Sequence, residues 1–147
     1  MNFADPVHVR MRTAVDSSVL FDVLLPDPDF GSASAQLLRE SIDSGVMVAC
    51  EVVWAEVRAS FPGDVLFLDA MDKLGVQFDA ISGKSAQTAG ALWRQYRSRK
   101  DSKRDHLIPD FLVGSHALHQ SDVLLCRNRG FYRRYFSKLR ILDPSIP

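Results

Sequence analysis

The chain has 147 residues and no net charge at pH 7, and 46% of its residues are hydrophobic and 24% charged. These values predict one globular domain with a normal core and exclude fibrous and disordered classes. No apolar run approaches the roughly 18 residues that span a membrane, and the N-terminus lacks the apolar stretch of a secretory signal. Cys50 and Cys126 adjoin apolar runs and are predicted to be buried thiols, so we expect a cytoplasmic protein.

The charge is unevenly distributed along the chain. Residues 1–90 contain 6 Lys and Arg against 13 Asp and Glu, whereas residues 91–147 contain 12 against 5. Such asymmetry indicates an anionic partner for one part of the surface, or two halves that neutralise each other in the fold. It does not by itself identify a nucleic acid.

Short apolar strands alternate with helical segments along the chain. Residues 1–10 precede a second methionine and are interpreted as a candidate disordered extension, so a single domain is predicted over residues 11–147. Strands are predicted up to Asp16 and over residues 46–50, 76–81, 122–128 and 139–143. Helices are predicted from Ser17 and over residues 34–45, 51–61, 63–75, 82–99 and 109–120, with a loop over residues 26–34.

This alternation predicts an α/β fold: an α/β/α sandwich around a central, mainly parallel sheet of four to five strands. Ligands bind such sheets beyond the carboxyl ends of the strands. Sites of chemistry are therefore predicted at Asp16, at the start of the helix that follows residues 46–50, and around Asn128.

Three acidic residues fall on that side of the predicted sheet. Asp16 and Asp110 each begin a helix and could simply be caps. Glu56 lies toward the negative end of a short helix, so it either points to solvent near Arg58 or is satisfied by a cation. Taken together, clustered carboxylates would repel one another without a cation, and oxygen ligands suit Mg²⁺ or Mn²⁺.

The segment LLCRNRGFYRRYF, residues 124–136, joins the end of an apolar strand to interleaved arginines and aromatics. This composition favours contact with a negatively charged partner. Elsewhere, His116 and His119 could bind zinc from one helix, but the sequence offers no evident third Cys or His ligand. A phosphate-accepting receiver domain also uses clustered acids, but no apolar strand here delivers the late Lys that it needs.

With these residues in place, the chain from Met11 to Pro147 resembles a PIN domain, and more narrowly a VapC-type toxin of bacterial type II toxin–antitoxin systems. The resemblance rests on four ordered motifs: AVDSSVLFD, VVWAEV, IPDFLVGSHAL and LLCRNRGFYRRYF. It implies a PIN-like fold and a Mg²⁺- or Mn²⁺-dependent ribonuclease that hydrolyses RNA phosphodiesters. It also implies a cognate antitoxin and a homodimer as partners.

The resemblance assigns roles to individual residues. Asp16, Glu56 and Asp110 match the first three acids of the family's metal site, and Ser17 matches the small hydroxyl residue beside the first acid. The fourth position reads Asp in the usual family pattern TRDRGFYR, whereas this chain has Asn128 there, with Cys126 in place of Thr. The residues expected to bind RNA are Ser17, Arg127, Arg129, Arg133, Arg134 and Tyr132, with Phe131 expected to pack inward.

Asn128 leaves two functional hypotheses open. An amide oxygen can still bind a hard cation, but the cluster loses one negative charge, so metal affinity should fall. The alternative is therefore a weakened or inactive PIN module that binds RNA or a protein partner.

Overall fold

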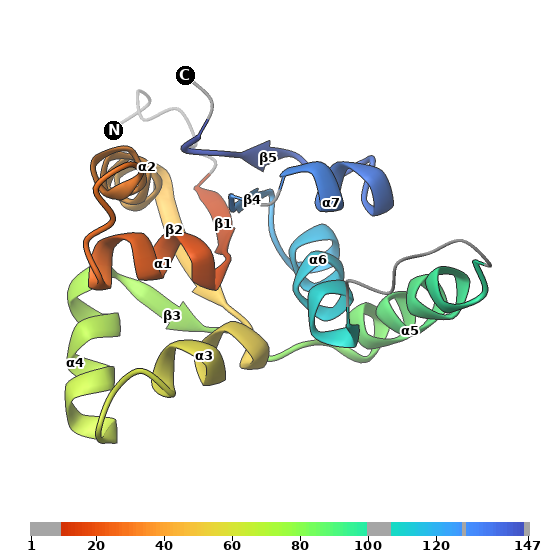
Figure 1. The fold of residues 1–147 in the computed structure, drawn as a ribbon, viewed down its shortest axis with the longest axis horizontal. Helices are drawn as coiled ribbons and strands as arrows, with labels where there is room; N and C mark the ends of the chain where they lie inside the picture. The colour runs from red at the N-terminus through yellow and green to blue at the C-terminus, as the bar shows by residue number, and fades with distance from the viewer. Residues whose placement is uncertain (1–9, 100–106, 128, 146–147) are drawn as a thin grey trace, which may run out of the picture.

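The structure, a computed structural model, describes residues 10–99, 107–127 and 129–145. Residues 1–9 of the expected N-terminal extension and Asn128 lie outside these ranges. The described part of the chain contains a five-stranded sheet with helices on both sides (Figure 1). No helix within it is long and apolar enough to span a bilayer.

The sheet is parallel throughout, and its central strand is the first in the sequence. The strand order is β3-β2-β1-β4-β5, and every neighbouring pair runs parallel. The predicted α/β/α sandwich with four to five strands is thus confirmed. The strands are β1 (Met11–Val15), β2 (Gly45–Ala49), β3 (Val76–Phe78), β4 (Val123–Leu125) and β5 (Ile141–Leu142).

Two groups of helices cover the sheet. Those that connect β1, β2 and β3 lie on one side, and those that follow β3 lie on the other (Figure 1). The first group is α1 (Ser17–Leu24), α2 (Gly31–Ser44), α3 (Glu51–Arg58) and α4 (Asp64–Leu74). The second group is α5 (Gly83–Arg97), α6 (Ile108–Gln120) and α7 (Arg129–Tyr135).

The core is built on the short apolar strands. Val15, Met47 and Leu124 are at most 1% exposed, as expected for parallel strands that are covered on both faces. Cys50 and Cys126 are free, buried thiols, which confirms the prediction made from their apolar surroundings.

Two local predictions were wrong. Helix α2 begins at Gly31, inside the predicted loop, because the Asp27 carboxylate accepts hydrogen bonds from the N–H groups of Asp29 and Phe30 and closes the turn early. Strand β4 ends at Leu125, and the basic segment after it forms α7, for which no helix was predicted.

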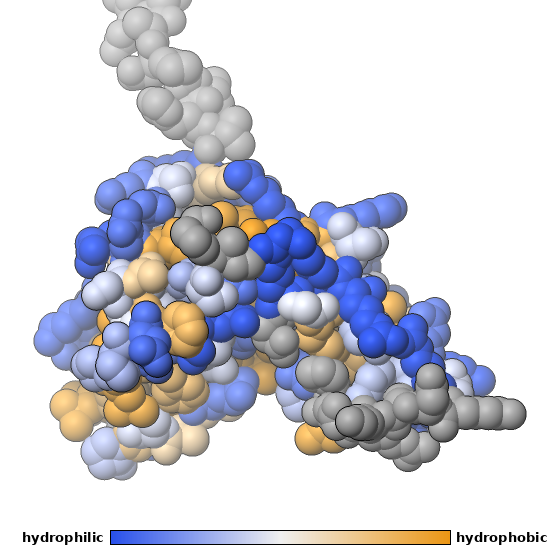
Figure 2. Space-filling model, turned by 45° about the horizontal axis from the view of Figure 1, so that its top comes forward, coloured by the Kyte–Doolittle hydropathy of each residue, from blue (hydrophilic) through white to orange (hydrophobic). Residues whose placement is uncertain are grey.

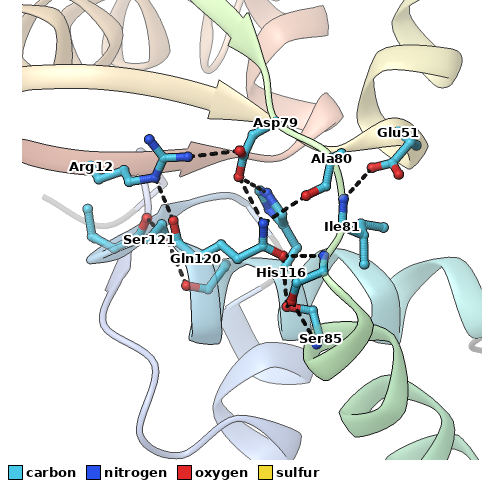
Figure 3. A network of polar contacts seen from close by, with 12 residues as sticks. Arg12, Glu51, Asp79, Ala80, Ile81, Ser85, His116, Gln120 and Ser121 are labelled. Carbon is cyan, nitrogen blue, oxygen red and sulfur yellow. Dashed lines mark hydrogen bonds and ion pairs between the residues drawn. The ribbon is translucent and has the colours of Figure 1, made fainter.

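A network of hydrogen bonds and ion pairs joins α6 to the sheet (Figure 3). Its centre is Asp79, directly after β3, which lies 2.9 Å from Arg12 of β1 and 2.8 Å from Nε2 of the buried His116. Gln120 donates to the same carboxylate at 3.1 Å. Burial raises the pKa of Asp79, but the hydrogen bonds and charges of His116 and Arg12 outweigh it and lower that pKa below its usual value.

The network makes the stability of the fold depend on Asp79. An acid with a depressed pKa in the folded state stabilises it at pH values above the unfolded pKa, and this contribution is lost as pH falls through the folded pKa. We expect Asp79→Asn to lower the free energy of unfolding by about 1–3 kcal/mol at pH 7, with the loss shrinking below pH ~4. Urea denaturation at both pH values measures this, with Asp72→Asn on the exposed side of α4 as control. An equal loss at both pH values would contradict the assignment.

Candidate metal site at the carboxyl ends of the strands

A cleft with a volume of about 450 Å³ opens beyond the carboxyl ends of β1 and β4. All three acids that the sequence singled out line it. We call it the acid cleft, and its polar lining is Asp16, Ser17, Ser18, Glu56, Asp110 and Arg127. Phe21, Val52, Pro109 and Val113 supply apolar walls.

Asp16 is both a helix cap and a residue of the acid cleft. Its N–H donates to the carbonyl of Leu125 at 2.9 Å, which fixes it beside the end of β4. Its Oδ1 accepts from the N–H of Ser17 at 2.7 Å, and its Oδ2 accepts from the hydroxyl of Tyr132 at 3.1 Å. Burial raises the pKa of Asp16, and the nearby charge of Asp110 raises it further, although these hydrogen bonds oppose the rise.

Glu56 lines the same cleft from the C-terminal half of α3. Partial burial raises its pKa first, and the charges of Asp16 and Asp110 raise it further. Arg58, the alternative partner considered from the sequence, instead binds Asp64 at 2.6 Å. The carboxylate of Glu56 therefore lies among like charges.

Asp110 stands in the first turn of α6, where its Oδ2 accepts a hydrogen bond from the N–H of Leu107 at 3.2 Å. The capping role considered from the sequence is therefore real, and Asp110 still lines the acid cleft. Its charge raises the pKa of both other acids. Asp110 is thus both a helix cap and a residue of the acid cleft.

The three carboxylates share a cleft without converging on a single point. Within residues 10–99, 107–127 and 129–145, no group of three His, Cys, Asp or Glu side chains is close enough to hold one metal ion. The oxygens of Asp16 already accept hydrogen bonds, as does one oxygen of Asp110. The donor set still suits Mg²⁺ or Mn²⁺, because these ions take one or two carboxylates and complete their coordination with water and phosphate oxygens.

The four arginines expected to bind RNA do not act as one group. Arg127 enters the acid cleft, where its Nε lies 2.8 Å from Asp22 and its guanidinium stacks 4.5 Å from the ring of Phe30. The Nε–H makes no aligned hydrogen bond in the described structure, so the contact with Asp22 is an ion pair held by proximity. Arg127 therefore contacts Phe30 in the loop before α2 and also lines the acid cleft.

The remaining arginines lie on α7, away from the three acids. Arg129 and Arg133 line a different hollow, of about 480 Å³, between α2, α7 and β5. That hollow also contains Glu40 and Asp143, so its charge is mixed. Arg134 is exposed and lies 5.6 Å from the ring of Tyr135.

Tyr132 is not placed for the contact with RNA expected of it. Its side chain is only 2% exposed, so its ring presents no face to a base. Burial and the charge of Asp16 raise its pKa well above the ordinary value, so its hydroxyl keeps the proton that it donates to Asp16. Phe131 packs inward as predicted, at 6% exposure, and Ser17 is 9% exposed at the edge of the cleft.

Three contacts at the site were not predicted from the sequence. Two join the buried Asp22 to Arg127 and, at 2.7 Å, to the hydroxyl of Ser34. The third is the hydrogen bond from Tyr132 to Asp16. A single charge within the apolar stretch SSVLFDVLL could have marked Asp22 as a buried, paired acid, whereas nothing in the sequence ties Tyr132 to Asp16.

The comparisons with known proteins identify the fold. No protein-family model matches the sequence, and no curated protein matches it. Solved structures do match. One is VapBC2 from Rickettsia felis bound to a promoter DNA fragment, with a TM-score of 0.68 and 15% identity over 90% of this chain and 98% of that chain.

Two further toxin–antitoxin structures share the architecture. VapBC-1 from nontypeable Haemophilus influenzae has a TM-score of 0.67 and 15% identity, covering 92% of this chain and 99% of the other. A complex from Klebsiella pneumoniae has a TM-score of 0.63 and 18% identity, covering 90% and 97%. At these identities the likeness establishes the PIN-like α/β/α fold over nearly the whole chain.

The crowding of carboxylates predicts a stability effect at Glu56. An acid with a raised pKa in the folded state destabilises it when ionised, and this cost disappears as pH falls through the folded pKa. We expect Glu56→Gln to raise the melting temperature at pH 7 in chelator and to have no effect near pH 4. The gain should stay below about 1 kcal/mol because Glu56 is partly exposed and solvent screens its charge.

Differential scanning calorimetry at both pH values measures the change. Glu40→Gln on the exposed side of α2 is the matched control. A destabilised Glu56→Gln variant at pH 7 would show that Glu56 is not repelled by its neighbours.

Proposed function

We propose that this chain is the toxin of a toxin–antitoxin pair and acts as a metal-dependent ribonuclease that hydrolyses RNA phosphodiesters. The observation that carries the proposal is the acid cleft. Three carboxylates, from Asp16, Glu56 and Asp110, line one cleft beyond the carboxyl ends of a parallel sheet, where ligands of such sheets bind. The structural neighbours from Rickettsia felis, Haemophilus influenzae and Klebsiella pneumoniae are toxin–antitoxin complexes, which supports the biological role.

In this proposal Asp16, Glu56 and Asp110 would hold Mg²⁺ or Mn²⁺ through their carboxylate oxygens. A bound divalent ion lowers the pKa of its water and stabilises charge that develops on the phosphate.

Electrostatics favour a cation-dependent mechanism. An RNA phosphate that approached the acid cleft alone would meet three negative side chains. Arg127 is the described basic residue that lines the cleft, and its guanidinium is partly neutralised by Asp22. A divalent ion would therefore provide most of the positive charge that a phosphate needs there. Arg129, Arg133 and Arg134 would contact phosphates farther along the RNA.

The same proposal includes a cognate antitoxin and a homodimer. Apolar side chains are exposed on one side of the molecule, and Figure 2 shows apolar surface at its lower left, where α3 and α4 lie in Figure 1. Val65 of α4 is 82% exposed, Leu66 57% and Leu68 52%. Exposed apolar residues that lie together are typical of protein–protein contact surfaces.

The second candidate function is a PIN-like module that binds RNA or a protein partner without cutting. The observation that favours it is Asn128, a neutral residue at the position where the family pattern has an acid. The two candidates differ in one respect: cleavage that depends on a divalent ion.

The proposed activity is tested by incubating purified chain with RNA in Mg²⁺ or Mn²⁺, with and without a chelator. We expect cleavage that the chelator abolishes and that falls more than about 100-fold in Asp110→Asn, because outer-shell partners alone are worth 10–100-fold. Asn keeps an acceptor for the N–H of Leu107, so the start of α6 should survive. Asp72→Asn is the matched control. Equal cleavage by Asp110→Asn and the unaltered chain would reject the enzyme assignment.

Asn128 gives a prediction of its own. We expect Asn128→Asp to tighten Mn²⁺ binding and to increase cleavage at limiting metal, because it adds a negative oxygen ligand. Calorimetric titration with Mn²⁺ and cleavage assays over a range of Mn²⁺ concentrations measure the two effects. A fall in both would contradict the view of Asn128 as a weakened ligand.

A further inference from the structure

The hydroxyl of Tyr132 reaches Asp16 across 116 positions in the sequence. Tyr132 lies on α7, after β4, whereas Asp16 directly follows β1 and caps α1. The hydrogen bond is 3.1 Å long, and the tyrosine side chain that makes it is almost fully buried. The contact therefore joins two distant segments inside the protein, at the first acid of the acid cleft.

Donors on two different elements fix the carboxylate of Asp16. Its Oδ1 accepts from the N–H of Ser17, in the first turn of α1, at 2.7 Å. Its Oδ2 accepts from Tyr132, on α7. Donors at one oxygen restrain rotation of the carboxylate about its bond to Cβ less than donors at both oxygens do. With both donors present, the plane of the carboxylate is set.

Tyr132 is itself held in place by close packing. Its ring centroid lies 5.1 Å from that of Phe131 and 6.2 Å from that of Phe136. Phe136 in turn packs against Gly114 of α6, where a Cβ atom would lie 2.2 Å from the phenyl ring. Helix α7 thus packs closely against α6, and this packing fixes the position of the Tyr132 hydroxyl beside Asp16.

We propose that Tyr132 is a positioning residue for the metal site: its hydroxyl holds the Asp16 carboxylate in the orientation that binds Mg²⁺ or Mn²⁺. The inference rests on the proposed function and deepens it. Hydrogen-bond partners of metal ligands orient those ligands, and their removal typically weakens metal binding or activity by 10–100-fold. Packing alone would be satisfied by phenylalanine, whereas the hydroxyl makes the contact with the acid.

The test compares Tyr132→Phe with Tyr135→Phe in the full chain without RNA. The first change removes one hydroxyl and keeps the ring. The second makes the same change on the same helix, at a residue whose hydroxyl accepts from Arg99 at 3.3 Å. Free Mn²⁺ is measured by electron paramagnetic resonance as protein is added. We expect Tyr132→Phe to bind Mn²⁺ about 10- to 100-fold more weakly and Tyr135→Phe to bind it as the unaltered chain does.

The outcomes separate this inference from the proposed function. If the unaltered chain does not bind Mn²⁺, the proposed function and the inference both fall. If it binds and Tyr132→Phe binds equally well, only the role of Tyr132 is overturned. Cleavage by Tyr132→Phe should recover as Mn²⁺ is raised toward saturation, since the defect lies in metal affinity. A loss that persists at saturating Mn²⁺ would contradict the inference.

A second measurement does not require the variant to fold. The chain has three tyrosines, and a divalent ion that binds Asp16 must change the environment of the Tyr132 hydroxyl. We expect Mg²⁺ to perturb tyrosine absorption in the unaltered chain and in Tyr135→Phe, with reversal by chelator. If Mg²⁺ binds and the tyrosine absorption does not change, the inference is overturned.

Discussion

The pairing of β1 with β4 is the constraint on which the site depends. Val15 lies opposite Leu125, and the N–H of Asp16 extends the ladder by one hydrogen bond to the Leu125 carbonyl. The first acid is thereby fixed beside the point where the chain leaves β4 toward Arg127 and α7. Both strands are buried, so a shift in register would move apolar side chains and the acid together at high cost. The pairing of these buried strands therefore determines the geometry of the acid cleft.

The negative charges of Asp16, Glu56 and Asp110 repel one another in the acid cleft, and this repulsion lowers the stability of the folded protein. The charges of Asp16 and Asp110 both raise the pKa of Glu56. Their neighbours supply limited compensation, because the guanidinium of Arg127 is shared with Asp22. Acids that repel one another are common at functional sites, and in the proposed function the charge of a divalent cation would offset this repulsion. The contact of Arg127 with Asp22 also shows that the basic C-terminal part partly neutralises the acidic N-terminal part.

The sequence predicted the features that depend on local pattern. Apolar runs such as residues 46–50 identified the buried strands, and the parallel arrangement followed from their alternation with helices. Because parallel strands end on one side of a sheet, Asp16, Glu56 and Asp110 could be assigned to one cleft. Helix α7 was missed because the pattern of its arginines and aromatics reflects its packing against α6 and Asp16, and the sequence does not show that packing. The hydrogen bond from Tyr132 to Asp16 was unpredictable for the same reason, since it joins surfaces that only the folded chain brings together.

The central claim is that the acid cleft binds a divalent cation, and a crystal structure of the chain soaked in Mn²⁺ tests it most directly. Anomalous scattering locates manganese independently of any assumption about its ligands. We expect an anomalous peak between Asp16 and Asp110, within reach of Glu56 directly or through one water. A manganese ion bound elsewhere, with the acid cleft holding water alone at saturating Mn²⁺, would contradict it.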